Sequence, residues 1–298
     1  MSRPIAGQSP RGVNRFRFFC LDAYRRYHRP SYIDPDPLAI VRRFESLADR
    51  EVVGFLASAL ALGRVGGIVG AVDDVLARLH SIDGRSPAGT LLENNPEAIT
   101  GSLAGFCYRF FDQRQMAALL VALKRLLQEY GSLESVFADG VVGVRAPESV
   151  VRGSIVMQGL SHLVSAIRRA ADGVLDRSIL VAQPSKGSAC KRLLLFLRWM
   201  VRADEIDPGG WCVVAPSQLL VPLDTHMISI GRAFGILRSA SGSLRASARL
   251  TEALAYVDPD DPVRFDFSLA RLGIHPDIDK AEQIACGDFA DTGDFATL

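Results

Sequence analysis

The sequence lacks the residue spacings that usually hold metal ions. Its five cysteines are an odd number, lie far apart and form no C-x-x-C pair, which argues against a structural zinc site and a disulfide framework. The five histidines are scattered, without H-x-x-x-H or H-E-x-x-H spacing. We therefore expect no metal and no cofactor.

Long apolar runs and leader signals are also missing. The longest apolar stretches, such as Val52 to Leu62, are too short to cross a bilayer, and the N-terminus has no apolar segment of a secretory signal. Neither G-x-x-x-x-G-K-[ST] nor G-x-G-x-x-G occurs, which argues against the common nucleotide-phosphate loops. We expect a protein of the reducing cytoplasm with no membrane partner.

Charge of one sign is not in excess. The 298 residues carry a formal net charge of +1, the pI is about 7.7, and 48% of the residues are hydrophobic. This length and composition suffice for one large domain or for two small ones that share an interface. A nucleic-acid-binding protein of this composition would have to gather its basic residues on one face.

No segment shows the sustained alternation of apolar and polar residues that marks a half-buried strand. Apolar residues recur instead at helical spacing, which predicts an all-α fold of about a dozen helices. The expected helices span residues 14–28, 38–44, 48–62, 68–80, 88–93, 96–103, 112–130, 133–138, 150–170, 188–202, 224–236, 248–256 and a last helix that ends at residue 273.

The stretch Pro184–Gly235 contains two of these helices and a polar residue at the start of each. Lys191 lies in the first turn of the first helix, and Asp224 is well placed as the N-cap of the second. The positive end of a helix holds an N-cap aspartate ionised and disfavours a lysine cation, which favours nucleophilic amine chemistry at Lys191. A nearby carboxylate would partly cancel the effect on the lysine, so its net sign stays open. We expect both side chains to be buried.

Sequence blocks around these two residues carry a resemblance. VPLDTHMISIGRAFG, which contains Asp224, resembles the segment of the catalytic aspartate in the helix-hairpin-helix DNA glycosylases, the superfamily of endonuclease III and 8-oxoguanine glycosylase. SACKRLLLFLRW resembles their lysine-bearing helix, with Lys191 at the position of the Schiff-base lysine. Over residues 16–276 the chain resembles the bacterial family DUF2400 more closely, through the blocks YIDPDPL, LADREVVGFLASALALGRV, KGSACKRLLLFLRWMVR, PLDTH and DPVRFDFSLARLGI.

The chain departs from the glycosylase pattern in several places. The turn before the lysine, Gln183–Ser188, has one glycine instead of two. The lysine and the aspartate lie 33 positions apart (224 minus 191), a longer interval than in the best-known members. Leu60 stands where many relatives carry a base-wedging glutamine, and the four-cysteine iron–sulfur loop of many endonuclease III relatives is absent.

The resemblance implies a two-lobed helical fold with a cleft between the lobes. Residues 45–202 would form a central lobe, and residues 14–44 together with 203–275 would form a terminal lobe. A disordered arm, residues 1–13, and an acidic tail, residues 276–298, would flank them.

The resemblance also implies DNA base-excision repair by a DNA glycosylase, with or without abasic-site lyase activity. Lys191 would form the Schiff base, Asp224 would stabilise positive charge on the sugar, and the partner would be DNA with a damaged or modified base. We expect a monomer, and the sequence does not specify the lesion. The residues expected to contact DNA are Lys186, Gly187, Ser188, Arg64, Arg198 and His226.

Two other interpretations stay open. The chain can be a non-catalytic helical nucleic-acid-binding module on a glycosylase-like scaffold, or Lys191 and Asp224 can form a structural salt bridge. Arg64 can face either substrate or solvent. His226 fits a hydrogen-bonding role at a helix start better than a catalytic base, and the aromatic cluster Phe106–Phe111 fits a core helix end better than base stacking.

Overall fold

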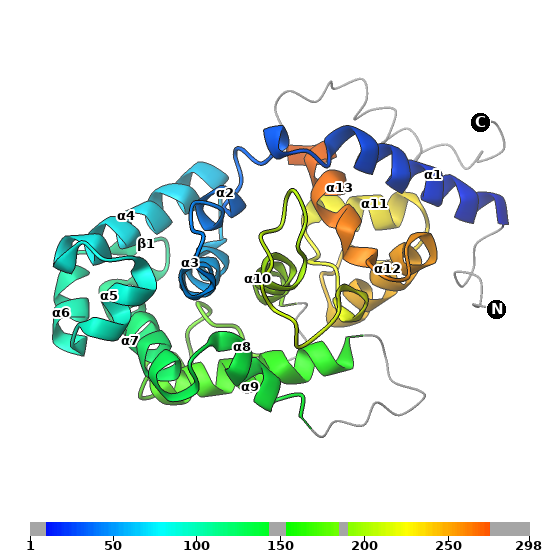
Figure 1. The fold of residues 1–298 in the computed structure, drawn as a ribbon. Coiled ribbons are helices and arrows are strands. Elements are labelled where there is room, and N and C mark those ends of the chain that lie inside the picture. The colour runs from blue at the N-terminus through cyan, green and yellow to red at the C-terminus, as the bar shows by residue number, and fades with distance from the viewer. Residues whose placement is uncertain (1–9, 143–152, 185–189, 275–298) are drawn as a thin grey trace.

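The computed structural model describes residues 10–142, 153–184 and 190–274, and regular structure in these ranges is almost entirely helical (Figure 1). This confirms the predicted all-α class. The α-helices are α1 (Pro10–Tyr27), α2 (Leu38–Val41), α3 (Leu47–Leu60), α4 (Val65–Asp83), α5 (Pro87–Glu93), α6 (Pro96–Ser102), α7 (Gln113–Tyr130), α8 (Leu133–Asp139), α9 (Ser154–Ala170), α10 (Lys191–Val201), α11 (Thr225–Ala233), α12 (Leu244–Val257) and α13 (Phe265–Ile274). Short 3₁₀ helices are η1 (Pro30–Tyr32), η3 (Pro216–Gln218) and η4 (Pro262–Arg264).

Short polar side chains fix where many of these helices begin, since they accept hydrogen bonds from first-turn backbone N–H groups. Such N-caps are Ser86, Asn95, Asp112, Ser132, Asp224 and Ser243. Ser243 starts α12 at Leu244, four residues before the predicted start at residue 248. Helix α1 likewise begins earlier than predicted, at Pro10 instead of residue 14.

Most of the aromatic cluster Phe106–Phe111 lies in a small β-hairpin, so the predicted helix end is wrong at this position, whereas Phe106 and Phe111 are buried as a core position predicts. Strands β1 (Cys107–Tyr108) and β2 (Phe111–Asp112) pair antiparallel, with Tyr108 opposite Phe111. Two positive φ angles, 74° at Gly105 and 55° at Arg109, interrupt helical geometry on both sides of β1. The following helix, α7, then begins behind the Asp112 cap.

The buried side chains form two hydrophobic cores. The first core is built from α2 to α10 and from residues 206–220. The second core is built from α1, α11, α12 and α13, together with Val221 and Leu223. Helix α13 contributes to both, because Phe267 lies in the first core and Leu269 in the second. The division into a central and a terminal lobe stays a prediction.

Helix α10 lies between α3 and the group formed by α11, α12 and α13 (Figure 1). It packs closely on α3, where the rings of Phe55 and Phe196 meet edge to face at 5.3 Å. A Cβ built on Gly54 of α3 would lie 3.1 Å from the Met200 side chain, so the glycine permits this close approach. The first residue of α10, Lys191, is thereby fixed next to the C-terminal end of α3.

Candidate functional site

A cavity of about 780 Å³ lies where α3, α10, α11 and α13 meet. Its wall includes the turn after α3, the start of α10, residues 222–226 and the α13 residues Asp266, Ala270 and Arg271. Lys191 and Asp224 both line it, together with Arg64, Arg198 and His226. The packing of distant elements thus brings to one cavity five residues that the sequence analysis selected.

Lys191 is the first residue of α10, and its neighbours hold it at the cavity wall. The preceding residue, Cys190, adopts a left-handed conformation with φ of 46°. The following residue, Arg192, donates hydrogen bonds to the carbonyl oxygens of Ala59, near the end of α3, and of Ile179. The Lys191 side chain itself is exposed, which corrects the expectation that it is buried. Its amine is therefore accessible from the cavity.

Asp224 is the N-cap of α11, as predicted, but it is half-buried and not fully buried as expected. Its Oδ1 accepts a hydrogen bond of 2.7 Å from the Met227 backbone N–H. The segment before it is tied to α12, because the Val221 N–H donates to Thr251 Oγ1 at 2.9 Å and the Ser247 hydroxyl donates to the Val221 carbonyl at 2.6 Å. These bonds fix the direction from which the carboxylate enters the cavity.

Asp266 is a buried carboxyl group of the same cavity that the sequence analysis did not select. It lies in the first turn of α13, where Arg198 Nη1 donates to its Oδ2 at 2.5 Å. Burial raises the pKa of Asp266 to about 6; the Arg198 cation opposes this shift, and the nearby charge of Asp224 adds to it. The signal in the sequence was an aspartate between two phenylalanines in the block DPVRFDFSLARLGI.

Arg198 belongs to the wall of the cavity, although it is only 3% exposed. Its guanidinium contacts Asp207 at 3.1 Å as well as Asp266 at 2.5 Å, so two carboxylates already neutralise it. Arg202, the C-cap residue of α10, contacts Asp207 and also binds Asp261 at 2.9 Å. A buried, doubly paired arginine is a structural cation, and we therefore leave Arg198 out of the DNA contacts proposed below.

The remaining predicted contact residues have different surroundings. Arg64 is exposed at the start of α4, on the rim of the cavity. His226 is half-buried, and its ring lies so close to Gly273 of α13 that a Cβ at Gly273 would collide with it. This contact agrees with a structural role for the histidine. Lys186, Gly187 and Ser188 lie outside the described residues.

Three absences bear on the alternatives. Within the described ranges, no ion pair joins Lys191 to Asp224, so the structure does not show the salt bridge between them. No cluster of three or more His, Cys, Asp or Glu side chains in the described part of the chain could hold a metal ion. Among the helices that the structure describes, none is both long and apolar enough to cross a membrane.

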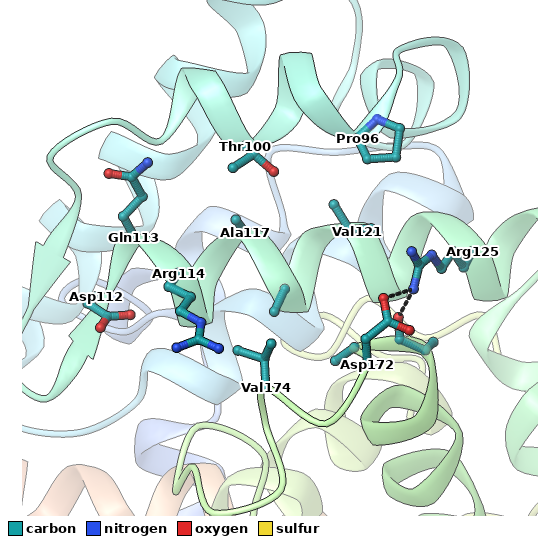
Figure 2. Close-up of a pocket in the computed structure, with 13 residues that line it drawn as sticks. Pro96, Thr100, Asp112, Gln113, Arg114, Ala117, Val121, Arg125, Asp172 and Val174 are labelled. Carbon is teal, nitrogen blue, oxygen red and sulfur yellow. Dashed lines mark hydrogen bonds and ion pairs between the residues drawn. The ribbon is translucent and has the colours of Figure 1, made fainter.

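A second cavity, of about 530 Å³, lies between α6, α7 and the chain that follows α9 (Figure 2). Its wall is largely formed by small apolar side chains such as Ala117 and Val121. Arg125, at one end, donates to Asp172 at 2.7 Å and to the Ala170 carbonyl at 2.5 Å. This pairing satisfies the arginine, and the wall contains no lysine, so we place the functional site in the larger cavity.

The comparison with protein families matches residues 36–275 to the family described as "Protein of unknown function (DUF2400)". This match covers most of the chain, and the chain belongs to that family. No curated protein and no solved structure matches the chain.

Proposed function

We propose that this protein is a DNA glycosylase with abasic-site lyase activity, and that the cavity of about 780 Å³ receives the damaged nucleotide. The observation that carries the proposal is the meeting of an exposed lysine, Lys191, and an ionisable N-cap, Asp224, in one cavity of that size. An enzyme that excises a base must take it out of the DNA stack, and a cavity can hold such a flipped nucleotide. The proposal places this cavity in a cleft between two lobes.

The chemistry proposed for Lys191 is covalent. Its neutral Nζ forms a bond to C1′ of the deoxyribose while the bond from C1′ to the base breaks and the departing base takes up a proton. The sugar ring then opens to give a protonated imine between Nζ and C1′, and loss of a proton from C2′ allows the C3′–O bond to break. Asp224 accepts the proton that the amine gives up and stabilises positive charge that develops on the sugar.

Lysine scarcity makes this proposal easy to test. The chain has only four lysines: Lys124, Lys186, Lys191 and Lys280. Of the two lysines in the described ranges, Lys124 is buried and donates to the carbonyls of Leu91 and Leu92, whereas Lys191 lines the cavity. A covalent adduct with DNA can therefore be assigned to one residue with few variants.

The experiment is borohydride trapping on duplexes that carry an abasic site, uracil, 8-oxoguanine or an alkylated base. We expect the parent protein to form a covalent adduct, Lys191→Ala to form none, and Lys280→Ala, the matched lysine control, to retain it. Asp224→Asn should slow base release by about 100-fold or more, the scale on which general acid–base groups contribute. Thermal unfolding of each variant checks that the fold is intact.

Absence of an adduct on every substrate would contradict the lyase step, and absence of base release as well would contradict the glycosylase. If the parent still bound DNA in a salt-dependent manner that Lys191→Ala left unchanged, the non-catalytic binding module would replace the present proposal.

A further inference from the structure

The β-hairpin Cys107–Asp112 packs against the turn between α3 and α4, which forms part of the rim of the cavity. Tyr108 donates its hydroxyl to the Leu62 carbonyl at 2.8 Å, and its ring lies over Gly67 at the start of α4. A Cβ built on Gly63 would lie only 2.7 Å from Nη1 of Arg109. Leu62 and Gly63 themselves line the cavity, so the hairpin extends its rim outward.

Of the two residues at the tip of this hairpin, Arg109 lies against Gly63, whereas the ring of Phe110 is not required by the packing. Phe111 is 1% exposed and packs into the first core, whereas Phe110 is 69% exposed. Arg109 has φ of 55°, a left-handed conformation that is unfavourable for a residue other than glycine. Its guanidinium lies 5.8 Å from the centre of the Phe110 ring. The turn of a two-residue hairpin favours this positive φ, so the feature that the fold leaves unexplained is the exposed Phe110 ring beside a cation at the rim of the cavity.

The positively charged side chains around the rim of the cavity indicate which kind of ligand would suit the hairpin tip. Arg109, Arg64 and Lys191 are all exposed, and within the described ranges none of the three forms an ion pair. Arg43 and Arg125, which are also exposed, each pair with an aspartate, so their charges are already partly balanced. A row of unpaired cations beside an exposed aromatic ring suits a polyanion that also offers flat apolar faces, which is the chemistry of nucleic acid with unstacked bases.

We propose that Arg109 and Phe110 form a nucleic-acid contact in which an unstacked base lies on the Phe110 ring and Arg109 binds a neighbouring phosphate. This inference rests on the proposed function only in taking DNA as the ligand, and it adds a contact at the hairpin that does not depend on chemistry at Lys191. It assigns the hairpin tip to recognition of locally opened strands beside the cavity.

The test measures binding of a fluorescein-labelled duplex in which a tetrahydrofuran abasic analogue leaves the opposite base unpaired. Phe110→Ala should weaken binding by about tenfold, within the range measured for loss of one base–aromatic stack. Phe18→Ala is the matched control, because Phe18 is 73% exposed on α1, and it should leave binding unchanged. Neither variant should change the thermal midpoint, since both rings are exposed.

Two further variants separate stacking from charge. Phe110→Trp should retain binding, and the fluorescence of the new indole should be quenched when DNA is added. Arg109→Gly removes the charge but suits the left-handed backbone, and it should reduce the slope of log Kd on log salt by about one. Equal binding by Phe110→Ala and Phe18→Ala would overturn the inference, as would a parent protein that binds no DNA. Binding that depends on Phe110 without any trapped adduct would contradict the lyase chemistry alone.

Discussion

The buried carboxyl group of Asp266 should make the stability of the folded protein depend on pH. Because its pKa is raised to about 6 in the folded protein, the folded state keeps a proton that the unfolded chain has already released between about pH 4 and pH 6. The contribution of this group to the free energy of unfolding is therefore fully present below pH 4, falls as the pH rises through 6, and is constant above that.

Replacement of Asp266 by Asn should remove this pH dependence. We expect the stability of the parent relative to Asp266→Asn to fall between pH 4 and pH 6.5, as measured by urea unfolding at a series of pH values. Asp258→Asn is a control of opposite sign. Burial raises the pKa of Asp258, but the hydrogen bond and charge of Arg264, together with the hydrogen bonds from the Asp260 and Asp261 backbone N–H groups, outweigh it. They hold the pKa below its usual value, so the contribution of Asp258 is lost as the pH falls. Parallel curves for parent and Asp266→Asn would contradict the assignment.

Single residues also show what the sequence could predict about the site. Lys191 and Asp224 were identifiable because each lies at a helix start, where local sequence determines the surroundings. The burial of Arg198 and Asp266 could not be predicted from the sequence, because each is a polar residue whose partner lies on another element. These two residues are 68 positions apart in the chain. The local sequence pattern therefore identified the residues at helix ends, but it did not identify the ion pair between Arg198 and Asp266.

At the scale of elements, the tight packing of α8 against α9 depends on Gly159. A Cβ built there would lie 2.5 Å from the ring of Phe137, which is fully buried and also contacts Trp211. Overpacking of this kind costs about 1–3 kcal/mol, which exceeds the gain of about 1 kcal/mol from replacing a helical glycine by alanine. We expect Gly159→Ala to lower the free energy of unfolding in urea.

Gly70 of α4 provides the comparison for that variant. It lies on an exposed face of the helix, and a Cβ there would meet no atom within 4 Å. Gly70→Ala should therefore raise the free energy of unfolding by about 0.5–1 kcal/mol, the difference in helix propensity. If the two alanine variants were equally stabilised, the close contact between α8 and α9 would not exist.

Helix positions followed from sequence more reliably than the hairpin did. Apolar periodicity and N-cap residues act over a few positions, so α7 was predicted within one residue of its start. The hairpin is too short to show alternation, and its strands are held by distant partners, such as the bond from Tyr108 to Leu62. Tertiary contacts, absent from any local window, decide such short elements.

At the scale of the whole molecule, the cavity is a product of long-range packing. Its wall combines the end of α3, the start of α10 and one face of α13, which lie far apart in the chain. The sequence indicated five of its polar residues, but neither the size of the cavity nor the charge pairs at its wall could be predicted from it. Those features arise only when the first and second cores are assembled together.

The pairing of Arg198 with Asp266 connects α10 to α13, and α13 in turn contributes to both cores. Arg198→Met would leave Asp207 and Asp266 buried with less positive charge between them, and loss of one partner of a buried pair costs about 3–5 kcal/mol. We expect urea unfolding to show a loss of this size. The exposed pair of Arg43 and Asp73 is the matched control, and Arg43→Met should cost at most about 1 kcal/mol.

A double-mutant cycle then distinguishes the charge pair from simple packing. If Arg198 acts by neutralising Asp266, the double variant Arg198→Met/Asp266→Asn should be more stable than the sum of the two single losses predicts, because the unpaired carboxylate has been removed. A coupling free energy of about 1–3 kcal/mol is the expected size for a buried pair in contact. Strict additivity would mean that α10 and α13 are joined by apolar packing alone, with Phe267 and its neighbours as the connection between the two cores.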